Sequence, residues 1–216
     1  MAESNAHIVA DYGWDNAAPK CSQAYLAEPV ARALHKLNAV KILDLGCGNG
    51  AFSHDLQRRG FQVTGCDADP GGIAMAAQGD SGAAFRRVSL YDGPEALAEH
   101  GFDAVVSTEV VEHLFHPAAL PRFAAAVLKP GGHLIVTTPY HGYVKNLLIS
   151  LAGKWDSHHT ALWDGGHIKF WSRRTLTLLL EANGFDVVEF KGAGRIYGLW
   201  KSMVLTARLR GEQCSR

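Results

Sequence analysis

Residues 42–50, ILDLGCGNG, decide the fold of this chain. An apolar run ends at Leu45, and three glycines alternate with Cys47 and Asn49 directly after it. Glycines at these positions let the backbone turn sharply and let a ligand approach the main chain closely. In open sheets of parallel strands, ligands bind at the carboxyl ends of the strands. The stretch therefore predicts a strand, a ligand-binding turn and a helix that begins near Ala51.

Outward from this turn, short apolar runs alternate with helix-compatible segments. The apolar runs predict strands at residues 40–45, 61–66, 84–90, 102–107 and 133–138. The segments between them predict helices at residues 51–59, 70–77, 94–99 and 117–128. Strands that alternate with helices are typical of a parallel sheet covered on both faces.

The last part of the chain predicts a reversed strand. A helix capped by Ser172 is followed by two apolar runs, 185–191 and 199–209, with a short glycine-containing connection. A short connection between strands means an antiparallel pair. We therefore expect a doubly wound, Rossmann-like α/β fold with seven strands, mostly parallel with one antiparallel strand.

Two segments lie outside this alternation. The 216 residues fit one domain that covers residues 1–216. Residues 1–38 precede the first strand, and we expect an N-terminal helical or lid segment there. Residues 139–171 follow the fifth strand and are rich in aromatic residues and histidine, which is typical of a substrate lid.

Composition narrows the class of partner. Lys plus Arg equals Asp plus Glu at 21 each, so the chain lacks the cationic excess that a nonspecific grip on nucleic acid requires. The cysteines show no CxxC spacing, and we see no signal peptide or membrane-spanning run. We expect a cytoplasmic monomer or homodimer with a small-molecule substrate. Residues 147–152 and 197–205 are apolar enough for peripheral membrane contact, although a buried element or a dimer contact is the favoured interpretation.

The glycine spacing indicates the kind of cofactor. Dinucleotide-binding turns read GxGxxG, whereas this turn reads GxGxG with Asp44 two residues before Gly46. A carboxylate at that position repels pyrophosphate but suits the ammonium group of an amino-acid tail, which S-adenosylmethionine carries. Asp67 ends the second predicted strand, where a carboxylate accepts hydrogen bonds from ribose hydroxyls. These residues favour S-adenosylmethionine.

Four ordered segments resemble the class I S-adenosylmethionine-dependent methyltransferases, and in particular the ubiquinone-biosynthesis O-methyltransferase-like (methyltransferase type 11/12) group. They are ILDLGCGNG, VTGCD, FDAVVSTEVVEHL and LKPGGHLIVTTP, and they cover about residues 40–139. The resemblance implies that Asp92 lies near the adenine, with a turn cap as its alternative role, and that Ser107 and Thr108 line the methyl-transfer face. The expected cofactor-binding residues are Asp44, Gly46, Cys47, Gly48, Gly50, Asp67, Ala68, Leu90, Tyr91, Asp92, Ser107 and Thr108.

An acidic and histidine-containing cluster follows the fourth predicted strand. If residues 109–113 are helical, Glu109, Glu112 and His113 share one face and can hold a divalent metal such as Mg²⁺, with His167 as a further ligand. His141, His158 and His159 are alternatives to His167. The pattern resembles ubiquinone-biosynthesis O-methyltransferases and small-RNA terminal 2′-O-methyltransferases. Two alternatives to a metal site remain open. In one, His113 or His167 acts as a general base without a metal and Glu109 contacts substrate or cofactor. In the other, the cluster has a purely structural role.

The expected activity is methyl transfer from S-adenosylmethionine to a hydroxyl oxygen of an aromatic or diol metabolite, with S-adenosylhomocysteine as product. The sulfonium already supplies the leaving group, so the protein contributes proximity, desolvation and deprotonation. Metal-free N- or C-methylation is an alternative. An S-adenosylmethionine-binding partner protein without turnover is an alternative of another class.

Overall fold

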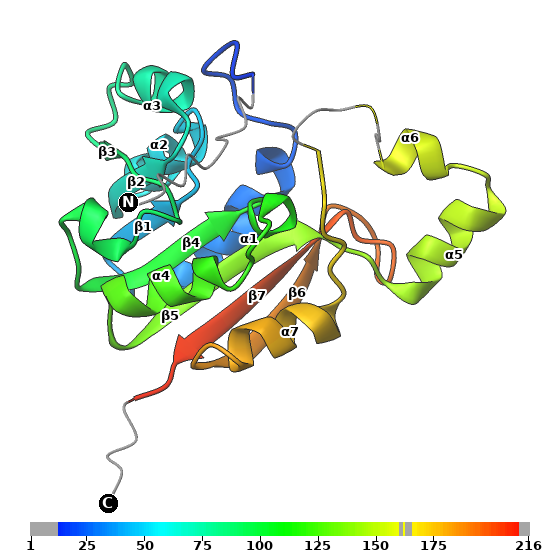
Figure 1. The fold of residues 1–216 in the computed structure, drawn as a ribbon. Helices are drawn as coiled ribbons and strands as arrows, with labels where there is room; N and C mark the ends of the chain where they lie inside the picture. Colours follow the sequence, from blue (N-terminus) through cyan, green and yellow to red (C-terminus); the bar gives the residue numbers. More distant parts are fainter. Residues whose placement is uncertain (1–12, 160–161, 163–165, 212–216) are drawn as a thin grey trace, which may run out of the picture.

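The fold is built on one twisted sheet, seen in a computed structural model that describes residues 13–159, 162 and 166–211 (Figure 1). Within these residues the sheet has seven strands in the order β3-β2-β1-β4-β5-β7-β6. The strands are β1 (Lys41–Leu45), β2 (Gln62–Asp67), β3 (Ala84–Arg87), β4 (Phe102–Thr108), β5 (Leu128–Pro139), β6 (Phe185–Ala193) and β7 (Ser202–Leu209). Strands β1 to β5 pair in parallel, and β7 runs antiparallel to both β5 and β6. The expected mostly parallel sheet with one reversed strand is confirmed.

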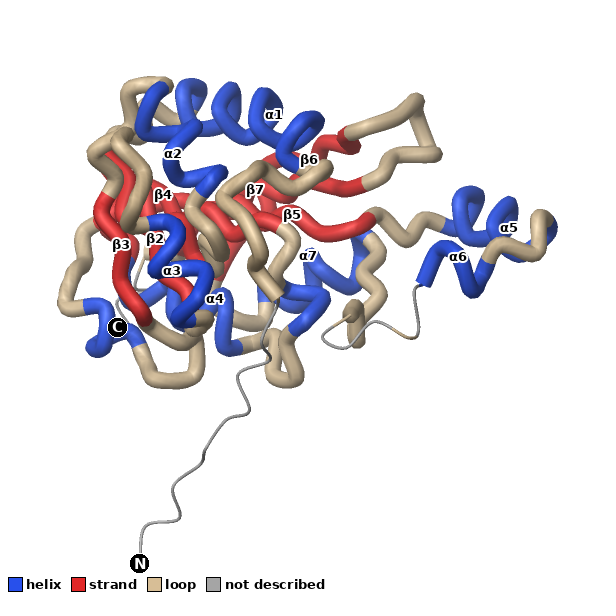
Figure 2. Tube along the Cα trace, turned by 90° about the horizontal axis from the view of Figure 1, so that it is seen from above, coloured by secondary structure: helices blue, strands red, loops and turns tan. Residues whose placement is uncertain are grey.

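Helices cover both faces of the sheet (Figure 2). The α-helices are α1 (Gln23–Lys36), α2 (Ala51–Arg58), α3 (Pro70–Ala76), α4 (Ala119–Val127), α5 (Tyr143–Leu151), α6 (Trp155–His159) and α7 (Arg173–Glu181), and the 3-10 helices are η1 (Pro94–Leu97) and η2 (Val111–His113). On one face, Leu34 of α1 and Leu56 of α2 pack against Ile42. On the other, α4 and α7 contribute Phe123 and Leu180 to a second core cluster. All five of these side chains are buried, so each face has its own apolar layer.

Local chemistry explains where two of the helices begin. Asp69 caps α3, because its Oδ1 accepts a hydrogen bond of 2.8 Å from the backbone N–H of Gly72. Ser172 caps α7 in a capping box, in which its Oγ accepts from Thr175 N and Thr175 Oγ1 accepts from Ser172 N. The helix expected after Ser172 is therefore present.

Some element bounds differ from those expected. Strand β3 ends at Arg87 rather than Leu90, because residues 89–92 form a turn closed by Asp92 Oδ2, which accepts from Ser89 N. The segment expected as a helix at 94–99 is the short 3-10 helix η1. Strand β5 begins at Leu128 rather than at the expected residue 133.

The insertion between β5 and α7 carries α5 and α6, which extend from the body of the molecule in both views (Figures 1 and 2). Parts of the two segments expected as lids, residues 1–12, 160–161 and 163–165, lie outside the described residues, as does Cys214. Tyr143, Leu148 and Leu151 of α5 are exposed, so the interpretation of 147–152 as a buried element is wrong. In the described part of the chain, no helix combines the length and apolar character needed to cross a membrane.

Candidate functional site

The glycine turn lies between β1 and α2, where the sequence predicts it. Gly46, Gly48 and Gly50 have positive φ of 84°, 53° and 76°, a region that L side chains rarely adopt. Gly50 precedes the first residue of α2, and a Cβ there would lie 2.5 Å from the Cβ of Ala76. The turn is therefore closed by backbone that only glycine fits. The expected cofactor contact Cys47 is buried in the same turn, and this burial raises the pKa of its thiol.

Asp44 lies beneath this turn and is fully buried. Its Oδ2 accepts a hydrogen bond of 2.6 Å from Ser53 Oγ, whereas its Oδ1 has no hydrogen-bond partner among the described residues. Burial raises the pKa of Asp44 to about 7. A buried carboxylate oxygen without a donor beside a glycine turn fits a ligand that brings its own hydrogen-bond donors, such as the ammonium of S-adenosylmethionine.

Asp67 connects two turns at the carboxyl edge of the sheet. Its Oδ2 accepts from Gly48 N at 2.8 Å and its Oδ1 accepts from Asp69 N at 2.9 Å. Burial raises the pKa of Asp67 despite these two bonds, and Ala68 beside it is half-buried. Each carboxylate oxygen retains acceptor capacity, which suits the ribose hydroxyls expected at this position. Asp67 therefore orders the turn that it is also expected to share with the ligand.

The remaining expected cofactor contacts lie at the next strand ends. Ser107 is fully buried and donates a hydrogen bond of 2.7 Å to the carbonyl of Leu45, so its hydroxyl joins β4 to β1. Thr108 is half-buried at the end of β4. Leu90 and Tyr91 are half-buried and pack on the core beside the exposed Asp92. Asp92 forms the turn cap that was its alternative role.

Glu109 differs from its expected conformation. The interpretation of residues 109–113 as one helix, with Glu109, Glu112 and His113 on one face, is wrong because Glu109 has a φ of 55° and only residues 111–113 form a 3-10 helix. The Glu109 carboxylate turns toward the sheet, where Thr137 Oγ1 donates to Oε1 at 2.9 Å and Ser202 Oγ donates to Oε2 at 3.1 Å. Burial raises the pKa of Glu109 to about 7.

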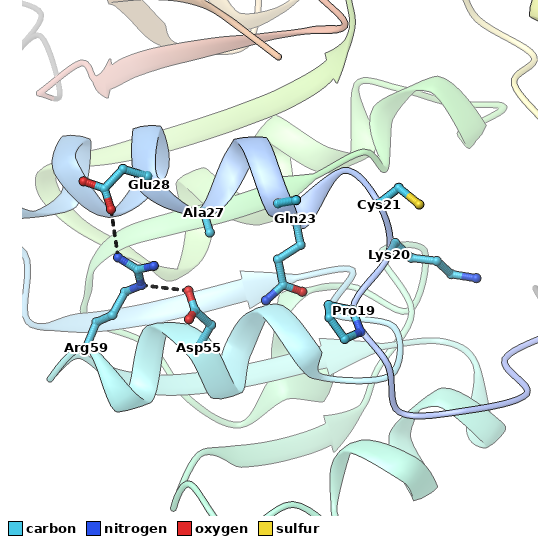
Figure 3. Close-up of a pocket in the computed structure, with 9 residues that line it drawn as sticks. Pro19, Lys20, Cys21, Gln23, Ala27, Glu28, Asp55 and Arg59 are labelled. Carbon is cyan, nitrogen blue, oxygen red and sulfur yellow. Dashed lines mark hydrogen bonds and ion pairs between the residues drawn. The ribbon is translucent and has the colours of Figure 1, made fainter.

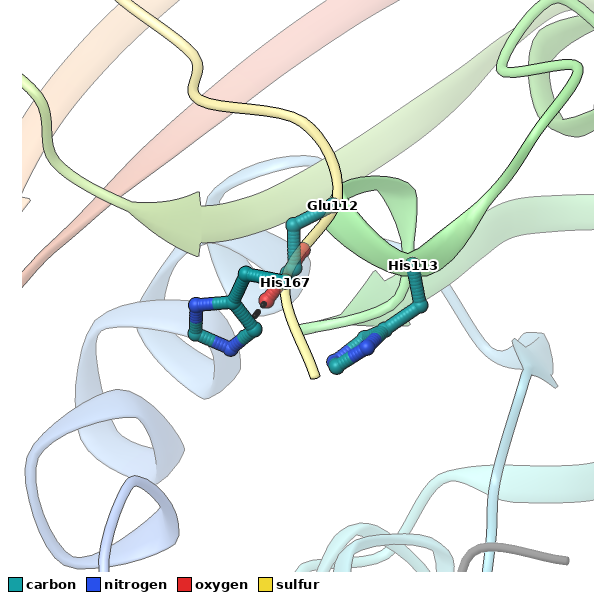
Figure 4. Close-up of side chains that lie close together, drawn as sticks. All are labelled: Glu112, His113 and His167. Atoms are coloured by element: carbon teal, nitrogen blue, oxygen red, sulfur yellow. Dashed lines mark ion pairs between the residues drawn. The ribbon is translucent and has the colours of Figure 1, made fainter. Parts of the chain in front are cut away.

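Glu112, His113 and His167 do come together (Figure 4). One potential ligand atom of each lies within 4.8 Å of the others, and Glu109 is not a member of this group. The segment that carries His167 is held there because the carbonyl of Glu112 accepts from the N–H groups of Ile168 and Lys169, each at 3.0 Å. The expected proximity of η2 to a histidine of the insertion is therefore present. The group contains three of the four residues that were expected as metal ligands.

The three side chains of this group have the character of metal ligands. Glu112 is 1% exposed, and neither carboxylate oxygen has a hydrogen-bond partner among the described residues, while His167 Nε2 lies 4.0 Å from Oε1. His113 Nδ1 donates to the carbonyl of Gly166 at 3.2 Å, which fixes the orientation of the ring. Burial lowers the pKa of His167 to about 4, so its imidazole is neutral near pH 7. Burial, together with the nearby Glu109 carboxyl, raises the pKa of Glu112 well above its usual range. A carboxyl group and two imidazoles are ligand types that fit a divalent cation.

The alternative histidines form an aromatic cluster instead. The ring centroid of His141 lies 5.8 Å from that of His159 and 5.1 Å from that of Phe170, and Trp155 stacks on His159 at 4.5 Å. His158 lies 4.9 Å from His159. Burial lowers the pKa of His141 to about 4, so this cluster is apolar in character and packs α6 against the base of the insertion. None of these three histidines joins the Glu112 group.

A shallow pocket of about 390 Å³ opens between α1 and α2 (Figure 3). It is lined by Cys21, Gln23 and an ion-paired row in which Arg59 contacts both Glu28 and Asp55. No residue expected to bind cofactor or substrate lines it. The pocket therefore shares no residue with the candidate site.

Sequence reasoning missed the partners of Glu109. Ser202 and Tyr25, whose hydroxyl lies 3.2 Å from Ser202 Oγ, come from β7 and α1. Lys145 is also buried, donates to the carbonyls of Tyr140 and Lys201, and has its pKa lowered to about 8 by burial. The sequence signal that singles out Lys145 is a lysine within a helix of mostly apolar residues. The sequence carries no comparable signal for Ser202.

Comparison with known proteins agrees with this geometry. Residues 20–190 match the family model described as a methyltransferase domain. The ubiquinone biosynthesis O-methyltransferase of Azorhizobium caulinodans is 35% identical over 181 residues, which cover 79% of this chain and 69% of that protein. Its namesake from Dinoroseobacter shibae is 30% identical over 192 residues, covering 86% and 69%. Magnesium protoporphyrin IX methyltransferase from Synechocystis, solved with bound S-adenosylhomocysteine, has the same fold, with a TM-score of 0.64 at 19% identity over 85% of this chain and 82% of that one.

The chain therefore belongs to the methyltransferase domain family, and it is an S-adenosylmethionine-dependent methyltransferase. A methyl donor with an amino-acid tail and a ribose agrees with the unpartnered oxygen of Asp44 and the acceptor capacity of Asp67. The similarity to the solved structures concerns the fold alone.

Proposed function

We propose that the protein transfers the methyl group of S-adenosylmethionine to a hydroxyl oxygen of an aromatic or diol small molecule. The observation that carries the proposal is the Glu112, His113 and His167 group, which follows the end of β4 at the same edge of the sheet as the glycine turn after β1. The relatives named for O-methyl transfer support a hydroxyl acceptor. The aromatic cluster around His141 and Phe170 supports an acceptor with a ring.

We also propose that this group holds a divalent cation such as Mg²⁺. Three protein ligands leave coordination positions open for two neighbouring oxygens of an acceptor. When bound there, a cation lowers the pKa of a hydroxyl and holds its oxygen in position for attack. Glu112 supplies a carboxyl ligand, His113 is oriented by the carbonyl of Gly166, and His167 is brought in by the insertion.

The acceptor and the cation are tested together. Activity toward a catechol and toward the matching monophenol is measured before and after chelation with EDTA and readdition of Mg²⁺, Mn²⁺ or Zn²⁺. We expect the catechol to be the better substrate, and we expect chelation or Glu112→Gln to reduce its turnover at least about a hundredfold. Glu95→Gln, an exposed glutamate on η1, is the matched control. Full activity in excess EDTA would contradict the cation, and a preference for amine acceptors would contradict O-methylation.

Helix α5 has an exposed apolar face that is a candidate contact surface. Tyr143, Val144, Leu148 and Leu151 are exposed apolar residues on this one helix. We propose that they meet a membrane surface or a second copy of the chain, the two contacts that the apolar sequence allows. Liposome flotation together with light scattering distinguishes these, because lipid binding by a monomer and dimerisation without lipid give opposite results.

A cytoplasmic location stays a proposal, supported by the free thiols of Cys21, Cys47 and Cys66.

A further inference from the structure

Residues 13–20, called the strap below, run across the glycine turn and are fastened to it by Asn49. The Nδ2 of Asn49 donates to the carbonyls of Asn16 and Ala18, each at 3.0 Å, and Asn49 Oδ1 accepts from Ala51 N at 3.3 Å. Asn49 is 4% exposed, so its carboxamide is fully committed to these contacts. The strap is therefore held by a side chain of the same turn that binds the cofactor.

The ring of Trp14 lies directly on this turn. A Cβ added to Gly48 would overlap Cζ2 of Trp14, and a Cβ added to Gly72 would lie 3.2 Å from its Cδ1. Gly48 belongs to the first strand-to-helix turn, and Gly72 belongs to the start of α3, directly after Asp67 and Asp69. The Lys20 ammonium lies 4.4 Å from the ring centroid. Gly48 and Gly72 thus form a surface without side chains, called the seat below, on which the indole ring packs. A larger residue at either glycine would collide with the ring.

This seat borders the turn in which the cofactor is expected to bind. Gly48 N donates to Asp67 Oδ2, so the ring touches the residue that links the glycine turn to the carboxylate expected to bind the ribose. Trp14 precedes residue 20, where the match to the methyltransferase family model begins, so the family match assigns it no role. Aromatic rings contribute large apolar contact area at little cost in side-chain entropy and attract cations to their faces.

We propose that Trp14 is a cofactor-binding residue, whose indole ring closes the outer side of the S-adenosylmethionine pocket over Gly48 while the strap holds it there. The ring covers the ligand and excludes water from the turn. Asn49 positions the ring through the strap. The proposal uses the cofactor class alone and does not depend on which acceptor is methylated.

The test is calorimetric titration of the full-length protein with S-adenosylhomocysteine, without acceptor. We expect Trp14→Ala to weaken binding at least about tenfold and Trp14→Phe to stay within about threefold of the wild type, because phenylalanine keeps an aromatic face in the seat. Unchanged or tighter binding by Trp14→Ala would overturn the proposal, since the ring would then lie off the ligand or occupy its place. Thermal unfolding without ligand shows whether the alanine variant is folded.

A spectroscopic readout keeps the proposal testable if Trp14→Ala does not fold. The chain has five tryptophans, and binding of S-adenosylhomocysteine is expected to change their fluorescence mainly through Trp14. Most of the ligand-induced change should therefore be lost in Trp14→Phe and retained in Trp155→Phe, the matched control on α6. A change of equal size in wild type and Trp14→Phe would overturn the proposal.

Discussion

Ser202 Oγ donates a hydrogen bond of 3.1 Å to Glu109 Oε2, which joins β7 to the end of β4 across 93 positions of sequence. Tyr25 of α1 lies 3.2 Å from the same hydroxyl, and Thr137 of β5 donates to the other carboxylate oxygen. This network holds Glu109 in its left-handed conformation, which is costly for a residue with a side chain and is found mainly where the surrounding structure imposes it.

We expect Ser202→Ala to destabilise the protein by roughly 1 to 3 kcal/mol, because it removes a donor from a buried carboxylate oxygen. The measurement is the free energy of unfolding from urea denaturation. Ser157→Ala, on the exposed helix α6, is the matched control and should leave stability nearly unchanged. Equal stability of Ser202→Ala and wild type would contradict the role of this hydrogen bond.

We expect the stability of the ligand-free protein to depend on pH through Asp44. Its pKa is raised by burial to about 7, so between about pH 4 and pH 7 the folded protein holds a proton that the unfolded chain has released. Stability from this group is complete below the unfolded pKa and is lost as pH rises toward 7. The free energy of unfolding of Asp44→Asn should therefore fall less steeply over that interval.

The control for this pH series is Asp156→Asn, an exposed residue at the start of α6. Its stability should follow the wild-type curve. The interpretation of Asp44 would be contradicted if Asp44→Asn and wild type lost the same free energy of unfolding between the two ends of the pH range.

We expect Asp67→Ala to weaken binding of S-adenosylhomocysteine by at least about tenfold, which corresponds to about 1.4 kcal/mol. The substitution removes the expected acceptor of the ribose hydroxyls and also releases the N–H groups of Gly48 and Asp69. Calorimetric titration measures the effect. Asp80→Ala, in the exposed connection before β3, should bind like wild type, and the same affinity in both variants would argue against a ligand contact at Asp67.

Much of this fold could be predicted because its signals are local. The apolar runs that became β1, β2 and β4 are each bounded by a glycine turn or a helix start, and a short connection before β7 indicates its reversed direction. The same locality explains how the sequence predicts the positions of Asp44, Gly48 and Asp67: a strand end, a turn and a spacing indicate them together.

The errors arose where distant contacts decide the conformation. Residues 109–113 have a helix-compatible pattern, but Thr137 and Ser202 hold Glu109 outside the helix. Ser107 lies at the expected strand end, and its hydroxyl has a partner, the carbonyl of Leu45, that belongs to the neighbouring strand. No spacing within either segment indicates these partners, because they depend on the register of strands that are far apart in sequence.

The central claim is methyl transfer from S-adenosylmethionine to a small-molecule hydroxyl oxygen. The most direct measurement is mass spectrometry and NMR of products formed from methyl-labelled S-adenosylmethionine with a panel of catechols, phenols, amines and cell extract. We predict a labelled product in which the methyl group is attached to the oxygen of a catechol or diol. A product labelled on nitrogen or carbon, or no labelled product while calorimetry shows that the cofactor binds, would contradict the account.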